Sequence, residues 1–561
     1  MDASLGIDLG TTYCAIATVD ATGRAVVLPN RHGQLLTPSV IYLRGDTPLV
    51  GEEAKEMQAL GATEVAAFFK RHMGDPNFVL QCDNREYTPV DLSSLILRTL
   101  KADAEAAVGH PLTRAVITVP AYFHNVQRQA TIAAGQQAGL DVLRIINEPT
   151  AAVLAYGLHQ AHGMQTILVY DLGGGTFDVT LAQITPTTIE VLATDGAHEL
   201  GGKDWDDRLA MHLGQCFQDD YGLDPLDDLL GFHDLLVRCE DAKRQLSVRD
   251  RARIIISHAG QKASYEVTRK QFEAMTRDLM ERTQNLTENV LYEAGLTWAH
   301  LDGVLLVGGS SRMPMVRQYV EAMAGKPPLG GVNVDEAVAV GAALQAYRDV
   351  TERAQTGSRF TLGSPKAIQD VMSHSLGIVA ENEDRSRYIN SIIIPRNTRI
   401  PCQEIRPFQL RTTDEQANHL EVYMLQGESQ DPSQCIVLGK YTFTGLTHTA
   451  QRLAIIDIGY AYDRNGMVTV TATERATGNA LSMQVDPLPT APPWLSLSPP
   501  EVATVPAHIA VFLVLDVSGS MAGAGLREAQ PAARAFISKS DLVHTSIGLI
   551  AFETQAQIMH A

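Results

Sequence analysis

The chain has 561 residues, of which 45% are hydrophobic and 19% are charged. One hydrophobic core rarely exceeds about 250–300 residues, so this length predicts several domains. The formal net charge of −19 argues against nonspecific binding to nucleic acid or to an anionic membrane. No apolar run approaches the roughly 20 residues that span a bilayer, and no secretory signal is evident. Six cysteines without a Cys-x-x-Cys pair favour a reducing, cytoplasmic compartment over a disulfide or zinc framework.

Three glycine-rich turns follow apolar, β-branched runs far apart in the chain. They occupy residues 7–13 (IDLGTTY), 170–178 (YDLGGGTFD) and 307–312 (VGGSSR). Glycine lets backbone N–H groups approach a phosphate closely, and threonine or serine adds a hydroxyl. An aspartate on the strand beside such a turn is suited to hold a hydrated Mg²⁺ ion. The three turns therefore predict one nucleotide bound between two related lobes.

The remaining patterns divide the chain into five segments. Residues 1–350 alternate β-branched runs with amphipathic stretches, which predicts α/β layers. Residues 351–370 are predicted to be a linker, because the polar stretch 356–370 contains Gly and Pro. Residues 371–485 show period-two alternation with turn signals, which predicts a β-sandwich. A Pro-rich linker over 486–508 precedes a final apolar strand at 509–515.

Residues 1–485 resemble the seventy-kilodalton heat-shock chaperone family (DnaK type), within the actin-like ATPase superfamily. The three turns carry this resemblance together with VPAYF at 119–123, IINEPTAA at 145–152 and DEAVA at 335–339. The resemblance implies a two-lobed actin-like ATPase over 1–350, ATP or ADP and Mg²⁺ as cofactors, and ATP-dependent chaperone activity. The alternative, an unrelated α/β protein with coincident glycines, does not account for the longer matches.

The resemblance assigns roles to residues that match the family's catalytic positions. Asp8 and Asp171 match the carboxylates that hold the hydration shell of Mg²⁺. Lys70 matches the lysine that orients the attacking water, and Glu148 matches the glutamate linked to it. Thr176 is expected near the γ-phosphate, and Asp178 near the metal and the water. Lys70 by itself, after two phenylalanines, would more often be a solvated helix residue, so its role rests on the order of its neighbours.

The nucleotide itself is expected to contact the turns and one helix. Glu240, Lys243, Arg244 and Ser247 share one helix face, which suits ribose and adenine, although a solvated charged face is the alternative. Asp335 is expected near the pocket, and Lys203 departs from the family, which has an acidic residue at this position. The turn residues implied by the resemblance are Gly10, Thr11, Thr12, Tyr13, Gly173, Gly174, Gly175, Gly201, Gly202, Gly308, Gly309, Ser310 and Arg312.

The β-sandwich at 371–485 resembles the family's peptide-binding domain. Ile378, Phe408, Leu420 and Val422 match its pocket for an apolar side chain of an extended peptide, and sandwich core is the alternative for them. Ala367–Asp370 replaces the family's leucine-rich linker, so weaker coupling between the domains is expected. No helical lid is expected after the sandwich. Unfolded apolar peptides, a J-domain co-chaperone and a nucleotide-exchange factor are the implied partners.

The last segment, 509–561, resembles the start of a von Willebrand factor A domain, which has an α/β Rossmann-like fold. Asp516, Ser518 and Ser520 match the metal-ion-dependent adhesion motif, whose oxygen ligands suit Mg²⁺ or Ca²⁺. Such a domain has about 150–200 residues, so we expect a truncated domain with an incomplete metal site. A nucleotide-binding scaffold that recruits partners through this segment is the alternative function. A small-molecule kinase of the same superfamily is a weaker one, because it predicts no peptide sandwich.

Overall fold

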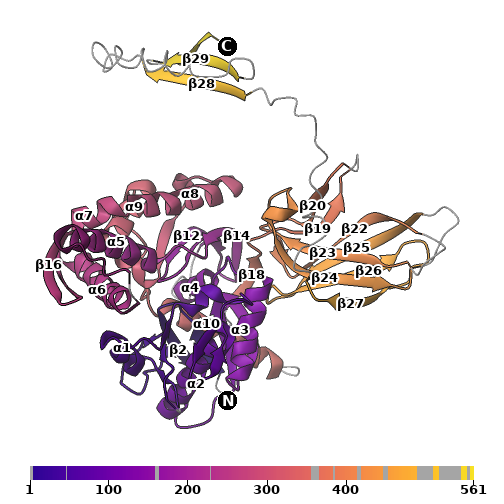
Figure 1. Ribbon diagram of the computed structural model, residues 1–561. Coiled ribbons are helices and arrows are strands. Elements are labelled where there is room, and N and C mark those ends of the chain that lie inside the picture. Colours follow the sequence, from indigo (N-terminus) through magenta and orange to yellow (C-terminus); the bar gives the residue numbers. More distant parts are fainter. Residues whose placement is uncertain are drawn as a thin grey trace. The chain divides into compact units, whose positions relative to one another are not determined.

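The computed structural model describes residues 4–45, 47–157, 163–227, 229–354, 366–382, 386–412, 418–446, 453–488, 509–516, 545–552 and 556–560. The chain forms two compact units, Met1–Ala380 with Asn390–Leu488 and Glu381–Ile389 with Pro489–Ala561. The first unit contains two α/β lobes and a β-sandwich, each built on its own sheets (Figure 1). Each unit is described by itself below.

The first lobe is built on a mixed sheet in the order β11-β10-β1-β2-β3. Its strands are β1 (Ser4–Asp8), β2 (Tyr13–Val19), β3 (Ala25–Val27), β10 (Arg114–Val119) and β11 (Asp141–Asn147). Leu5 and Ile7 of β1 belong to a core shared with helices α2 (Pro89–Val108) and α3 (Asn125–Gln137). Because side chains alternate along a strand, Gly6 faces the opposite side of the sheet. Asp8 ends the central strand β1, which places its carboxylate at the sheet's edge.

A small group of elements extends the first lobe. It comprises β4 (Thr37–Pro38), β5 (Val40–Tyr42), β6 (Leu49–Val50), helix α1 (Glu52–Ala59), β7 (Val65–Ala67), β8 (Leu80–Cys82) and β9 (Arg85–Tyr87). β5 pairs with both β6 and β7 in antiparallel fashion. A short 3₁₀ turn, Phe69–His72, follows β7 and carries Lys70.

Helices α4 (Glu148–Gly157) and α10 (Ala337–Ala354) share an apolar core with strands of both lobes. Close approach of α10 to its neighbours depends on glycine. A Cβ on Gly341 would lie 1.8 Å from the backbone oxygen of Ala151, and a Cβ on Gly6 would lie 1.9 Å from the backbone nitrogen of Ala343. The two helices therefore pack tightly beside β1 and hold Glu148, the first residue of α4, at a fixed place.

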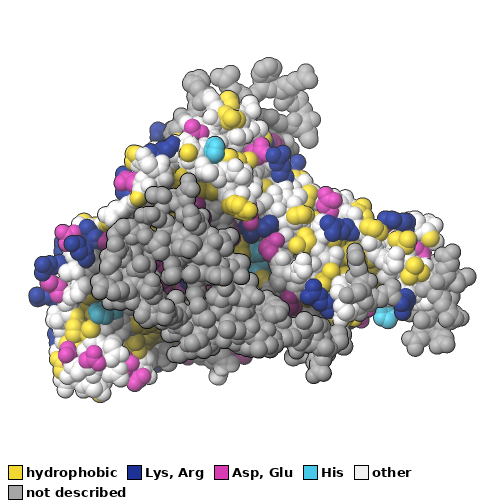
Figure 2. All heavy atoms as spheres, turned by 90° about the horizontal axis from the view of Figure 1, so that it is seen from above, with side chains coloured by type: hydrophobic (Ala, Val, Ile, Leu, Met, Phe, Trp, Pro, Cys, Tyr) yellow, Lys and Arg dark blue, Asp and Glu magenta, His cyan; other side chains and the backbone are white. Residues whose placement is uncertain are grey.

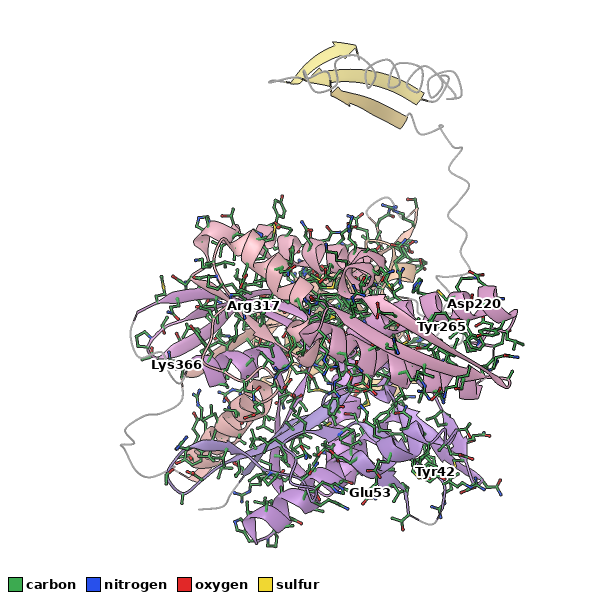
Figure 3. The ribbon with its side chains drawn as sticks, turned by 90° about the vertical axis from the view of Figure 1, so that its left-hand side faces the viewer. Tyr42, Glu53, Asp220, Tyr265, Arg317 and Lys366 are labelled. Carbon is green, nitrogen blue, oxygen red and sulfur yellow. The ribbon has the colours of Figure 1, made fainter. Side chains whose placement is uncertain are left out.

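The second lobe repeats the plan of the first. Its sheet has the order β17-β12-β13-β14-β18-β21, with strands β12 (Gln165–Leu172), β13 (Phe177–Ile184), β14 (Thr188–Ala197) and β17 (Gly303–Val307). Its other elements are α5 (Gly202–Tyr221), α6 (Leu229–Val248), α7 (Arg269–Met275), α8 (Arg277–Glu293), α9 (Pro314–Ala324) and the hairpin β15 (Arg251–His258) with β16 (Gln261–Thr268). Tyr265 of β16 lies beside Asp220 of α5 and donates to it at 2.8 Å (Figure 3).

The segment expected to be a linker is partly ordered. Its first residues belong to α10, and its last residues form β18 (Ala367–Val371), which pairs in parallel with β14 and antiparallel with β21 (Arg399–Ile400). Asp370 is half-buried in this strand and accepts hydrogen bonds from Asn147 Nδ2 at 3.1 Å and Thr150 Oγ1 at 3.0 Å. β18 thus connects the second lobe's sheet to a strand that lies within the segment expected to form the sandwich.

The β-sandwich has two sheets around its own apolar core. One sheet has the order β20-β19-β23-β24-β27 and the other β22-β25-β26. The strands are β19 (Leu376–Glu381), β20 (Tyr388–Ile394), β22 (Cys402–Arg411), β23 (Leu420–Gln426), β24 (Ile436–Thr444), β25 (Leu453–Tyr462), β26 (Val468–Glu474) and β27 (Ser482–Asp486).

In the second unit, the described residues from 509 onward form the strands β28 (Ile509–Asp516), β29 (Thr545–Phe552) and β30 (Ala556–His560). β28 and β29 are parallel, and β29 and β30 are antiparallel. On the face of the molecule seen in Figure 2, Lys and Arg side chains lie among Asp and Glu side chains. Over the part of the chain that the structure describes, no helix is both long and apolar enough to cross a membrane.

Candidate functional site

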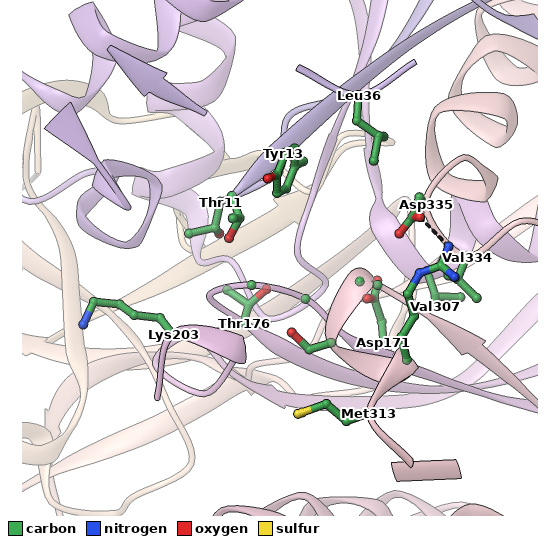
Figure 4. A pocket seen from close by; sticks show the side chains of 18 of the residues that line it. Thr11, Tyr13, Leu36, Asp171, Thr176, Lys203, Val307, Met313, Val334 and Asp335 are labelled. Carbon is green, nitrogen blue, oxygen red and sulfur yellow. Dashed lines mark hydrogen bonds and ion pairs between the residues drawn. The ribbon is translucent and has the colours of Figure 1, made fainter. Parts of the chain in front are cut away.

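A cavity of about 500 Å³ is lined by both lobes at the ends of β1, β12 and β17 (Figure 4). Most of the predicted site residues lie on its wall. They are Asp8, Gly10, Thr11, Thr12, Tyr13, Lys70, Glu148, Asp171, Gly173, Gly174, Thr176, Glu240, Lys243, Arg244, Ser247, Gly308, Gly309, Ser310, Arg312 and Asp335. The structure therefore brings together residues that are more than 300 positions apart in the sequence.

Four predicted residues lie behind the wall instead of on it. A Cβ on Gly201 would lie 2.5 Å from the backbone nitrogen of Gly175, so these two glycines let the β12–β13 turn pack on the start of α5. Gly202 donates its N–H to Gly173 O at 2.9 Å. Asp178 is buried and accepts from the backbone N–H of Tyr122 at 3.0 Å. These four residues therefore support the wall of the cavity without lining it.

The first two glycine turns face each other across the cavity, with Thr11 and Thr176 on opposite sides (Figure 4). A Cβ on Gly174 would lie 1.7 Å from Thr12 Oγ1, so only glycine allows this approach. Thr12 Oγ1 is buried and has no hydrogen-bond partner within the described structure. A buried hydroxyl without a partner is costly, and a phosphate oxygen at this place would accept its hydrogen bond.

Lys70 and Glu148 form a buried ion pair. Lys70 Nζ lies 2.7 Å from Glu148 Oε1, and the two residues are only 4% and 8% exposed. Burial disfavours the charged amine, but attraction to Glu148, the hydrogen bond to Glu148 and attraction to Asp8 together outweigh burial and raise the pKa of Lys70. The ammonium also lies 5.6 Å from the centre of the Phe123 ring. A permanent positive charge is therefore fixed beside the two turns, where a terminal phosphate would place its negative charge.

Three aspartates lie near this pair, of which Asp171 and Asp178 are buried and Asp8 is half-buried. Burial and then repulsion by Glu148 raise the pKa of Asp8 to about 7 and of Asp178 to about 8, and the same causes raise that of Asp171 well above its usual range. A divalent cation would relieve this repulsion, and carboxylate oxygens are the ligands that Mg²⁺ prefers. Among the described residues, no group of three or more His, Cys, Asp or Glu side chains could hold a metal ion.

The opposite end of the cavity is bordered by α6. Glu240, Lys243, Arg244 and Ser247 line the cavity from this helix, as their spacing predicts. Arg244 lies over the ring of Tyr13 at 5.2 Å, which fixes a flat cationic group at the wall. In addition, Arg312, which also lines the cavity, is paired with Asp335. Two arginines on opposite elements suit a planar aromatic base.

Sequence reasoning missed several residues that complete this wall. Lys55 of α1 bonds both Glu240, at 3.0 Å, and the Tyr13 hydroxyl, at 2.8 Å. Lys243 is held by Asp206 at 2.6 Å. Asp206 is four residues after Gly202, one of the predicted turn residues, on helix α5. Its place close to that turn is a signal in the sequence, whereas nothing in the sequence near Lys55 indicates its contact. Leu36, Phe68, Lys203, Val248, Val307, Met313, Val334 and Val338 also line the cavity.

The residues predicted for a peptide pocket lie in the sandwich. Ile378 and Val422 are buried in its core, at 3% and 0% exposure, and Phe408 and Leu420 are partly buried against that core. Phe408 on β22 is opposite Ile456 on β25. The arrangement fits both interpretations of these four residues, since core residues and pocket residues are apolar alike. Phe408 and Leu420 are the two that remain partly accessible.

The predicted C-terminal metal motif is only partly within the described structure. Asp516 is the last residue of β28 and pairs in register with Phe552 of β29. Ser518 and Ser520 lie outside the described residues.

Comparison with known proteins agrees with this geometry. The model of the Hsp70 protein family matches residues 4–79 and 75–492. The chaperone protein DnaK of Thermotoga neapolitana is 40% identical over 489 residues, which cover 86% of this chain and 80% of that protein. DnaK of Thermotoga maritima is similar to the same extent, with 40% identity over 489 residues.

Proposed function

This chain belongs to the Hsp70 family, and we propose that residues 1–350 form its ATPase domain and 371–485 its peptide-binding domain, joined by a linker over 351–370. As a member of this family, the chain is an ATP-dependent heat-shock chaperone that binds ATP or ADP and hydrolyses ATP. The observation that carries the assignment is the buried Lys70–Glu148 pair, which lines the same cavity as the two glycine turns.

In the proposed site, Gly10–Tyr13 and Gly173–Thr176 surround the phosphates, and Gly201–Gly202 support them from behind. Asp8 and Asp171 would hold Mg²⁺ through its water shell, and the ion when bound would neutralise charge on the phosphate oxygens. Asp178 would orient a water. Lys70, fixed by Glu148, would orient the attacking water and stabilise charge on the γ-phosphate, with Thr176 beside it.

The base and the ribose would lie between α6 and the turn after β17. Glu240 and Lys243 would bond the ribose hydroxyls, because each is already held by a fixed partner, Lys55 or Asp206. Arg244 would stack on the adenine, with Ser247 at its edge and Arg312 opposite. Gly308, Gly309, Ser310 and Asp335 would close the pocket around the nucleotide.

We further propose that an extended apolar peptide binds the sandwich with a side chain against Phe408 and Leu420, above the buried Ile378 and Val422. A J-domain co-chaperone and a nucleotide-exchange factor would be partners, and the compartment would be the cytoplasm. Residues 486–508 would be a spacer, and residues 509–561 the start of a von Willebrand factor A domain with Asp516 of an incomplete metal site. Nothing in the described structure specifically favours a scaffold role, and the presence of the sandwich argues against a small-molecule kinase.

The proposal is tested by single-turnover hydrolysis of Mg·ATP by the full chain, with and without a leucine-rich peptide. Slow hydrolysis in the absence of peptide, abolished when the metal is chelated, is expected. Binding of ATP without any hydrolysis would contradict the ATPase site. Hydrolysis without binding of the peptide would contradict the sandwich assignment alone.

A further inference from the structure

The sandwich contacts the two lobes through polar contacts within the first unit. Asn125 N donates to Gln426 Oε1 at 3.3 Å, and Ser373 Oγ donates to Ala121 O at 2.9 Å. Further bonds join Ile145 N to Asn465 Oδ1, Val468 N to Asn125 Oδ1 and Thr194 N to Asn397 Oδ1. The apolar core of the sandwich is separate from the cores of the lobes. A polar interface between separate cores can open without exposing either core, as interfaces between domains of one chain commonly do.

Two histidines lie in this interface. His374, which precedes β19, is 7% exposed, and its ring lies 4.1 Å from the ring of Tyr122 in the first lobe. Its Nδ1 lies 2.9 Å from Ser373 Oγ, the same hydroxyl that donates to Ala121 O. His374 therefore takes part in the contact between the sandwich and the first lobe through both its ring face and one ring nitrogen.

The second histidine, His124, caps helix α3 at its N-terminus. Its Nδ1 accepts from Gln127 N at 3.4 Å, and this role requires a ring nitrogen without a proton. The cap adjoins Asn125, whose backbone and side chain both bond to the sandwich. Protonation of His124 would therefore disturb the same few residues that anchor the sandwich.

The charged groups around the two histidines do not favour protonation. Burial lowers the pKa of His374 to about 3, with further contributions from His124, Arg396, Arg128 and the exposed His198. Burial, His198 and Arg128 lower the pKa of His124 to about 4.

The nearby carboxylates are already engaged by other groups. Asp195 and Glu293 pair with Arg396, and Glu428 accepts from the backbone and hydroxyl of Ser375. Asp178 accepts from Tyr122 N, and Asp370 from Asn147 and Thr150. Tyr122, the ring that faces His374, is itself a weak acid whose pKa burial raises further. A proton on either histidine would thus meet two arginines and a third histidine but no carboxylate free of a partner among these.

We propose that His374 makes docking of the sandwich onto the ATPase lobes sensitive to pH, with the docked form stable near neutral pH and released in mild acid. In the docked form His374 is buried against Tyr122 and near Arg128 of the first lobe, which disfavours its protonation, whereas after release it leaves these groups and returns to an ordinary histidine environment. His124 stays in the first lobe with Arg128 in both forms. The released form therefore binds more protons at His374, so acid favours it. For an ordinary pKa of about 6.5, lowering the pH from 7.5 to 5.5 should favour release about tenfold.

Hydrogen exchange at the amides of Asn125, Ile145 and Thr194 tests this, because each donates to a side chain of the sandwich. The full chain is compared with His124→Asn, His374→Gln and the double variant at each pH, without nucleotide and with a non-hydrolysable ATP analogue. The intrinsic rate of hydrogen exchange depends on pH. Dividing the exchange rate of a variant by that of the wild type at the same pH cancels this dependence. Asparagine keeps an N-cap acceptor, and glutamine keeps a partner for Ser373.

Wild-type protection should fall about tenfold between pH 7.5 and 5.5, His124→Asn should retain this fall, and His374→Gln and the double variant should lose it. The exposed His110→Gln should behave as wild type. Unprotected amides at pH 7.5 in both nucleotide conditions, or an equal fall in the double variant, would overturn the proposal. Since exchange is measured without hydrolysis, this outcome is independent of whether the ATPase assignment holds.

Discussion

The nucleotide cavity and the predicted peptide pocket lie in one unit of the molecule, but they differ in what makes them recognisable. The cavity contains buried charges such as Lys70 and Asp171, which a stable core alone would not contain. The peptide pocket contains Ile378 and Val422, which any β-sandwich core could contain. Buried polar groups therefore identify a site by themselves, whereas buried apolar groups do so only through a family resemblance.

The largest effect that separates the two regions is expected from Gly174→Ala. The new Cβ would lie 1.7 Å from Thr12 Oγ1, so the two phosphate turns must move apart. We expect nucleotide affinity to fall by at least about a hundredfold, or about 2.7 kcal/mol, while peptide affinity changes little. Isothermal titration calorimetry with ADP measures the nucleotide affinity. Gly330→Ala, where a Cβ meets nothing within 4 Å, is the control, and an equal loss there would refute the steric argument.

The buried charges of the nucleotide cavity predict a pH dependence of metal binding, which the apolar peptide pocket should not show. Without metal, the pKa values of Asp8 and Asp178 are raised to about 7 and about 8. Mg²⁺ favours the ionised carboxylates and so competes with protons, which means that its affinity should rise with pH. From pH 8 to pH 6 the affinity should fall about tenfold through Asp8 alone, and further if Asp178 also takes part. Titration of Mg²⁺ into the ADP-bound chain at pH 6, 7 and 8 tests this. Asp178→Asn should make the affinity for Mg²⁺ depend less on pH. An unchanged pH dependence in this variant would show that Asp178 does not contribute to it.

The sandwich can be tested by comparing a partly accessible residue with a buried one. Phe408→Ala should weaken binding of a leucine-rich peptide about tenfold, since its ring packs against the core from outside. Val422→Ala should instead lower the free energy of unfolding by about 1–3 kcal/mol, because it leaves a cavity in the core. Fluorescence anisotropy and denaturant unfolding measure the two effects. If Phe408→Ala changed only stability, these residues would be sandwich core and not a pocket.

The smallest effect concerns coupling between the two regions. Ala367–Asp370 replaces the family's leucine-rich linker and keeps Ile368 as its one large apolar side chain, although β18 pairs with β14 and Asp370 is anchored by Asn147 and Thr150. A ligand shifts an equilibrium only by its differential affinity for the two states. We therefore expect ATP to weaken peptide binding by less than about tenfold, roughly 1.4 kcal/mol. Peptide affinity measured in ATP and in ADP decides this, and a larger ratio would show that β18 transmits coupling well.

The sequence predicted the two lobes, the sandwich and most of the cavity wall, because the glycine turns and the i, i+3, i+4, i+7 spacing on α6 are local patterns. Long-range contacts could not be predicted in this way. Lys55 reaches Glu240 from another lobe, and β18 joins the sheet of the second lobe although its sequence suggests a linker. His374 lies against Tyr122 only because the sandwich packs on the first lobe, and nothing beside His374 in the sequence indicates this contact.

The central claim is that Lys70, held by Glu148, promotes ATP hydrolysis and not merely nucleotide binding. Single-turnover hydrolysis and ADP affinity should be measured together for wild type, Lys70→Ala and the exposed control Lys262→Ala. Because Lys70 would act on the transition state, Lys70→Ala should lose about a hundredfold or more of the hydrolysis rate while its ADP affinity stays within a few-fold of wild type. A hydrolysis rate equal to that of Lys262→Ala would contradict the account.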